Sequence, residues 1–104
     1  MRLGFKAEFI EPILVGHKTD TIRRSTTLQP GDYVNAGCRY DKPPFAVLRV
    51  LSVSRVTYAD MDRERAMGVA AMYPGAKEFA QITFEVVKAK KKRPRAWLST
   101  SSVN

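Results

Sequence analysis

The chain has 104 residues, of which 44% are hydrophobic, and this fits one globular domain with a single modest core. No apolar run approaches the roughly 18 residues of a membrane span, and the first residues lack the apolar core of a signal peptide. With one cysteine, Cys38, and one histidine, His17, we expect no internal disulfide and no conventional metal site. These features predict a soluble, cytoplasmic, monomeric protein that needs no cofactor.

The net charge of +8 is unevenly distributed along the chain. Residues 1–85 carry 12 basic and 10 acidic groups, whereas residues 86–104 carry six basic groups and no acidic one. We therefore predict a domain over residues 1–87 and a basic, flexible tail over residues 88–104. Such a tail attracts polyanions such as RNA without reading their sequence, or simply forms a solvated end.

The first predicted element is a short helix over residues 7–15, because apolar residues recur there at helical spacing. Pro12 is unfavourable inside a helix and divides this segment into two turns. Gly16 is a natural stop, since glycine accepts the left-handed conformation that often ends a helix. A short strand over residues 19–23 follows, with two threonines and an isoleucine that favour β structure.

The remaining chain alternates turn and strand signals. The predicted order is a turn at 29–32, a strand at 33–38, a long strand at 45–57, a weak helix at 59–72, a turn at 73–75 and a strand at 81–86. The alternation of the long strand slips near Val50 and Leu51, which predicts a bulge. The pattern favours a β-rich mixed α/β fold: a small barrel, mostly antiparallel, with short flanking helices.

The basic cluster between Gly16 and Arg24 is the leading candidate site. On a strand, Thr19, Thr21 and Arg23 share one face, while Ile22 on the other face points into the core. If the turn after Gly16 brings Lys18 beside them, burial and the charge of Arg23 would lower its pKa. The amine could then accept a proton from the Thr21 hydroxyl or from water, and Arg23 could hold a planar anion or a base edge. The alternative is an ordinary strand start with exposed basic residues.

Carboxylates in the second helical region could complete such a site. Glu64 and the neighbouring Asp60 and Asp62 could orient the lysine or act as a general acid or base. The alternative is a solvated helix face, in which these acids flank Arg63 and Arg65.

The order of these signals resembles the ASCH domain family. The similarity consists of an apolar helix, the string Gly16-His17-Lys18-Thr19-Asp20-Thr21-Ile22-Arg23, and a Pro30-Gly31-Asp32 turn before an apolar strand. It covers roughly residues 5–57 and continues weakly through residues 73–75 and the closing strand. The resemblance implies a PUA-like fold and binding of RNA or a modified nucleoside.

A small bacterial branch of this family deacetylates cytidine that is acetylated on its exocyclic amine, using a lysine, a threonine and a glutamate. The resemblance assigns these roles to Lys18, Thr21 and, as the nearest candidate, Glu64. Arg23 matches the arginine that ends the string. Other relatives are described as ribonucleases or coactivator domains, so the family does not select one chemistry.

Our first functional prediction is an RNA- or nucleotide-binding domain whose cleft is floored by Thr21 and rimmed by basic side chains. The candidate ligand-binding residues are Thr19, Arg23, Arg24 and Arg39. The second is an amidohydrolase acting on acetylated cytidine through Lys18, Thr21 and Glu64. The third is a protein-interaction module in which the cluster binds an acidic surface.

Overall fold

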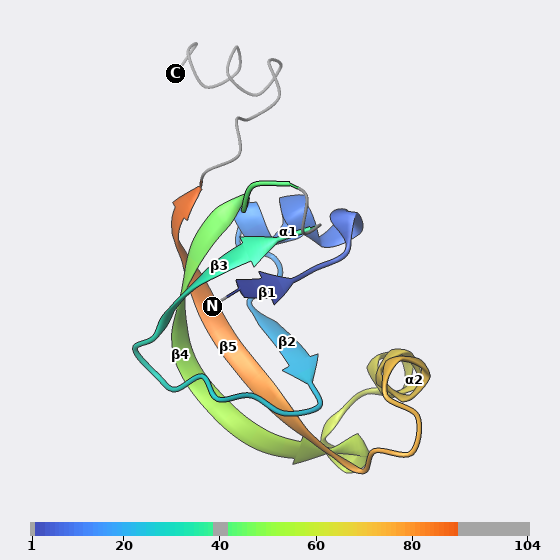
Figure 1. Ribbon diagram of the computed structural model, residues 1–104. Helices are drawn as coiled ribbons and strands as arrows, with labels where there is room; N and C mark the ends of the chain where they lie inside the picture. Colours follow the sequence, from blue (N-terminus) through green and yellow to red (C-terminus); the bar gives the residue numbers. More distant parts are fainter. Residues whose placement is uncertain (1, 39–41, 90–104) are drawn as a thin grey trace.

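Five strands form one sheet in the computed structural model, which describes residues 2–38 and 42–89 (Figure 1). The strands are β1 (Arg2–Gly4), β2 (Asp20–Arg23), β3 (Tyr33–Gly37), β4 (Ala46–Thr57) and β5 (Glu78–Ala89). Two short 3₁₀-helices, η1 (Ala7–Phe9) and η2 (Tyr58–Asp60), accompany the helices α1 (Ile10–Leu14) and α2 (Arg63–Met72). No helix in this described part is long and apolar enough to cross a membrane.

The sheet has the strand order β1-β3-β4-β5-β2 and is mostly antiparallel, as predicted. Only β1 and β3 pair in parallel among the described strands. The long strands β4 and β5 curve together through the molecule (Figure 1). The predicted bulge is confirmed, because the β4–β5 register shifts between Val50 and Ser52. A second shift lies between Val47 and Leu48.

The sheet does not close into the predicted barrel. Strands β1 and β2 are its two edges, and no backbone ladder joins them in the described residues. Instead, the side chain of Arg23 on β2 donates a hydrogen bond to the carbonyl oxygen of Gly4 on β1. The sequence pattern predicts where strands lie but not whether two distant edges pair. Strand β1 itself was not predicted, since three residues are too few to show an alternation.

The predicted first helix is two elements, but the division lies between Phe9, where η1 ends, and Ile10, where α1 begins, and not at Pro12 as predicted. Pro12 is tolerated because it occupies the first turn of α1, where its missing N–H has no helical partner to lose. Gly16 adopts φ +83° just beyond the helix, as its predicted role as a stop requires. The predicted second helix is likewise two elements, η2 and α2.

Within residues 2–38 and 42–89, two apolar clusters stabilise the fold. The larger one fills the curved sheet and includes Ile13, Leu48, Ile82 and Phe84, all of them buried. The smaller one joins α2 to the sheet and consists of Ile22, Val56, Val69 and Phe79. Val69 is the only buried residue of α2, so this helix is attached to the sheet through a narrow apolar contact.

Candidate functional site

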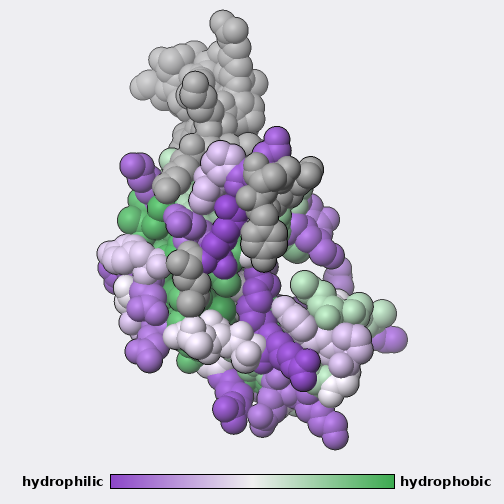
Figure 2. All heavy atoms as spheres, viewed as in Figure 1, coloured by the Kyte–Doolittle hydropathy of each residue, from purple (hydrophilic) through white to green (hydrophobic). Residues whose placement is uncertain are grey.

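A cavity of about 390 Å³ lies where the sheet fails to close. Its walls come from the segment after β1, from β2 with the loop before it, and from α2. Figure 2 shows the surface hollowed beside α2, with hydrophilic side chains along its border. The open seam between the two sheet edges is therefore the candidate site.

The loop after α1 carries Lys18 into this cavity. The backbone N–H groups of His17 and Lys18 both donate to the carbonyl oxygen of Pro12, at 2.8 and 3.0 Å. Together with the positive φ of Gly16, these bonds turn the chain back at the end of the helix. Lys18 is partly buried and lines the cavity, and its Nζ lies 4.6 Å from the centroid of the Phe9 ring.

The pKa of the Lys18 ammonium is lowered from its ordinary value of 10.5, first because burial removes water from the charged form. The charge of Arg65 lowers it further, Asp20 opposes the shift, and Arg23 adds to the lowering. This direction agrees with the expectation from the sequence, but Arg65 has a larger effect than Arg23. Among the described residues, the ammonium forms no ion pair.

Thr21 presents a buried hydroxyl to the same cavity. Its exposed fraction is 4%, and it is the only buried polar residue in the part of the chain that the structure describes. Arg23 Nη1 donates to Thr21 Oγ1 at 2.9 Å. Because a guanidinium can only donate, the hydroxyl oxygen accepts this bond and its own proton stays available for another partner.

Arg23 lines the cavity, but its guanidinium already donates hydrogen bonds to groups of its own chain. Besides Thr21, its guanidinium donates to the backbone oxygens of Ile22, at 3.2 Å, and Gly4, at 2.5 Å. It also lies over the Phe5 ring, 5.3 Å from the ring centroid. These contacts clamp the two sheet edges and leave the guanidinium few donors for a ligand.

The ion pair between Asp20 and Arg65 was not predicted from the sequence. Arg65 Nη1 on α2 lies 2.8 Å from Asp20 Oδ2 on β2, and Gln81 Nε2 donates to the same oxygen at 2.6 Å. Burial alone would raise the pKa of Asp20, but the hydrogen bonds from Gln81 and Arg65 and the charges of Arg65 and Lys18 lower it below 3.8. The sequence did contain an indication of this pair, because Asp20 shares the core-facing side of its strand with Ile22, and a carboxylate there needs a cationic partner.

The predicted acids have different positions. Glu64 lines the cavity from the exposed side of α2. Asp62 lines the cavity too, but its carboxylate caps α2 by accepting the backbone N–H of Arg65 at 2.8 Å. Asp60 forms a capping box with Thr57 at the start of η2. The structure therefore leaves Glu64 as the candidate acid with no capping role.

The other candidate ligand-binding residues lie apart from this group. Thr19 and Arg24 are exposed and do not line the cavity. Arg39 is outside the described residues, as is most of the predicted basic tail.

Comparison with known proteins places the chain in a family. No protein-family model matches the sequence. The chain is 33% identical over 99 residues to an N(4)-acetylcytidine amidohydrolase from Cronobacter sakazakii, with 83% of this chain and 95% of the relative covered. Its fold resembles that of the ASCH protein from Zymomonas mobilis, with a TM-score of 0.69, 11% identity, and 99% of this chain and 78% of that one covered. The chain belongs to the ASCH family.

A second ASCH structure has the same fold. The ASCH domain from Lactobacillus crispatus has a TM-score of 0.63 and 15% identity, covering 84% of this chain and 79% of that one. The predicted PUA-like, mixed α/β fold of the ASCH family is thus confirmed. In this ASCH protein, the G-x-K-T-x-T-x-R string forms the loop and edge strand that carry Lys18, Thr21 and Arg23.

Proposed function

We propose that this protein is an amidohydrolase that removes the acetyl group from cytidine acetylated on its exocyclic amine. One observation carries the proposal: the buried hydroxyl of Thr21 and the partly buried amine of Lys18, whose pKa is lowered, line the same cavity. The relative from Cronobacter sakazakii, which is named an N(4)-acetylcytidine amidohydrolase, supports this proposal.

The chemistry follows from these two groups. Thr21 Oγ1 attacks the acetyl carbonyl carbon while the neutral Lys18 amine accepts the hydroxyl proton. The tetrahedral intermediate then collapses, the C–N bond breaks, and the cytosine amine leaves with the proton that Lys18 had accepted. Water hydrolyses the acetyl ester on Thr21, so one water is consumed and cytidine and acetate are released.

Each neighbour has a defined contribution. A lowered pKa increases the fraction of Lys18 that is neutral and able to act as a base near neutral pH. The bond from Arg23 stabilises negative charge that develops on the Thr21 oxygen. Glu64, at the exposed side of the cavity, assists protonation of the leaving amine.

The cavity size favours a nucleoside over a long RNA. Its volume of about 390 Å³ falls in the range of roughly 300–1,000 Å³ that small-molecule sites occupy. The competing prediction of RNA binding depends on Arg23 and on the tail. Arg23 is bonded within its own chain, which leaves it few donors for a phosphate or a base.

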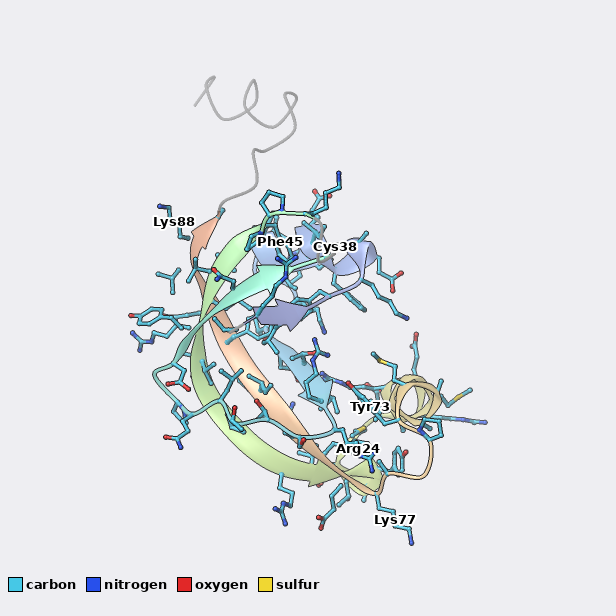
Figure 3. All side chains as sticks on the ribbon, viewed as in Figure 1. Arg24, Cys38, Phe45, Tyr73, Lys77 and Lys88 are labelled. Atoms are coloured by element: carbon cyan, nitrogen blue, oxygen red, sulfur yellow. The ribbon has the colours of Figure 1, made fainter. Side chains whose placement is uncertain are left out.

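The test is to incubate the protein with N4-acetylcytidine and to follow cytidine and acetate by chromatography. We expect turnover that falls on the order of 1,000-fold in Thr21→Ala and in Lys18→Met. Thr27→Ala and Lys77→Met are matched controls, because both residues are exposed and lie outside the cavity lining. In Figure 3, Lys77 points away from the molecule.

Two results would contradict the proposal. No release of cytidine by the wild-type protein would exclude the activity. Turnover at the wild-type rate in Thr21→Ala would exclude Thr21 as the nucleophile.

A further inference from the structure

We propose that Arg65, positioned by Asp20, binds the hydrogen-bond acceptor edge of the cytosine ring and selects cytosine over uracil. The inference depends on the proposed function for its substrate class. It adds a specificity-determining residue on α2, Arg65, and a positioning residue on β2, Asp20, which occupies a variable position of the K-T-x-T-x-R string.

Of the described residues, Arg23 and Arg65 bring guanidinium groups to the cavity, and the two differ in the number of N–H donors they have left. Arg23 bonds to Thr21 Oγ1 and to the carbonyl oxygens of Ile22 and Gly4. Within residues 2–38 and 42–89, the Arg65 side chain bonds to Asp20 alone, through Nη1. A guanidinium has five N–H donors, so Arg65 keeps most of them for a molecule in the cavity.

Asp20 fixes the direction of this guanidinium. The side chains of Arg65 and Asp20 are both mostly shielded from water, with exposed fractions of 32% and 22%. Gln81 on the neighbouring strand β5 donates to the same Asp20 oxygen and so holds the carboxylate in place. Asp20 itself is not part of the cavity wall. Asp20 therefore affects the cavity only through its ion pair with Arg65.

The chemistry of the ring determines what such a group can recognise. Cytosine presents two adjacent acceptors, the O2 carbonyl and N3, and acetylation of the exocyclic amine leaves both in place. Uracil carries a hydrogen on N3, which opposes a donor. The planar fork of arginine matches two adjacent acceptors and cannot accept a hydrogen bond from uracil. Arg65 therefore favours cytosine.

The experiment measures binding and turnover separately. The affinities of the full chain for cytidine and for uridine are measured by calorimetry or NMR titration in the wild type, Arg65→Met, Arg65→Lys and Asp20→Asn. Hydrolysis of N4-acetylcytidine is followed in parallel. Arg63→Met is the matched control, since Arg63 is exposed on the same helix and outside the cavity lining.

We expect the wild type to bind cytidine about tenfold more tightly than uridine, the scale of one bidentate base contact. Arg65→Met should weaken cytidine binding about tenfold and bring the ratio of the two affinities close to one. Asp20→Asn should reduce the ratio partially, while Arg63→Met should preserve it. Arg65→Lys retains a positive charge beside Asp20, so it shows whether loss of the fork, rather than misfolding, removes the preference.

The outcomes separate the two proposals. A wild type without preference for cytidine, or an unchanged ratio in Arg65→Met, would overturn the inference. If Arg65 only held α2 in place, its removal would weaken both nucleosides equally and leave the ratio unchanged. A cytidine preference that depends on Arg65, in a protein that releases no acetate, would overturn the amidohydrolase and retain the inference.

Discussion

Arg23 Nη2 donates to the carbonyl oxygen of Gly4, and this contact connects the two edge strands of the sheet across the open seam. The same guanidinium bonds to Thr21 Oγ1 and lies over the Phe5 ring. One side chain thus joins strands that no backbone ladder connects in the described residues, and it also contacts the proposed nucleophile.

The first prediction is that Arg23→Ala destabilises the fold. The substitution removes the contact to Gly4 and leaves the buried Thr21 hydroxyl without its charged donor, which together cost about 2 kcal/mol of the free energy of unfolding. Chemical denaturation measures this loss. Arg24→Ala is the adjacent control, because Arg24 is exposed and its removal should change stability by less than about 0.5 kcal/mol. Equal effects of the two substitutions would show that Arg23 is not a clamp.

The second prediction concerns Lys18 and alkaline pH. The folded-state pKa of Lys18 is below 10.5, so between that lowered value and 10.5 the unfolded chain holds a proton that the folded chain has released. The free energy of unfolding therefore gains a contribution as pH rises through this window. Below the window, the buried charge is a constant penalty.

Lys18→Met removes this penalty. The stability of this variant relative to the wild type should be greatest near pH 7 and should decline as the pH approaches 10.5. Urea denaturation at several pH values measures the difference, with Lys77→Met as the control for removal of an exposed lysine. The same decline in both variants would contradict a special environment for Lys18.

The third prediction is that Asp20→Asn loses stability near neutral pH but not in acid. The folded-state pKa of Asp20 is below 3.8, so its ionised form stabilises the fold above that value, and the contribution disappears as pH falls through the folded-state pKa. We expect a loss of about 1–2 kcal/mol at pH 7, because two hydrogen bonds to a carboxylate are weakened.

Denaturation at pH 7 and below pH 3.8 tests this sign. Glu8→Gln, at an exposed acid, is the control. A deficit of Asp20→Asn that persists undiminished in acid would show that the charge of Asp20 is not responsible.

The fourth prediction is that Gly68→Ala stabilises α2. A Cβ at Gly68 would meet no atom within 4 Å, and alanine is favoured over glycine inside a helix by about 1 kcal/mol. Thermal or chemical unfolding should show a gain of about 0.5–1 kcal/mol. Ala70→Gly, at an exposed position of the same helix, should produce a loss of similar size. A destabilised Gly68→Ala would mean that α2 packs more closely than the structure indicates.

Local signals predicted much of this fold. Gly16 stops a helix, and the slip at Val50 and Leu51 marks a bulge; each depends on the backbone preferences of a few residues. Pro12 was predicted to divide a helix, but it lies inside α1. The open seam depends instead on whether β1 and β2 meet, which is decided by the curvature of the whole sheet. A three-residue strand such as β1 offers no period to detect.

The candidate site likewise combines residues that are close in the sequence with residues that only the packing of the fold brings together. Lys18, Thr21 and Arg23 lie within six residues, and the loop and the adjoining strand bring all three to the same cavity. Arg65 lies 45 positions after Asp20, and only the packing of α2 against β2 brings them to 2.8 Å. A helix without a clear apolar stripe gives no indication of which of its arginines faces inward.

Because α2 contacts the sheet through a narrow apolar contact, the groups proposed for attack on the acetyl carbonyl and the group proposed for ligand choice lie on separate elements. The proposed nucleophile and its base belong to the sheet edge and the preceding loop, whereas Arg65, assigned to ligand choice, and Glu64 belong to a ten-residue helix anchored at Val69. A displacement of this helix relative to the sheet would therefore alter ligand choice while leaving the nucleophile and its base in place.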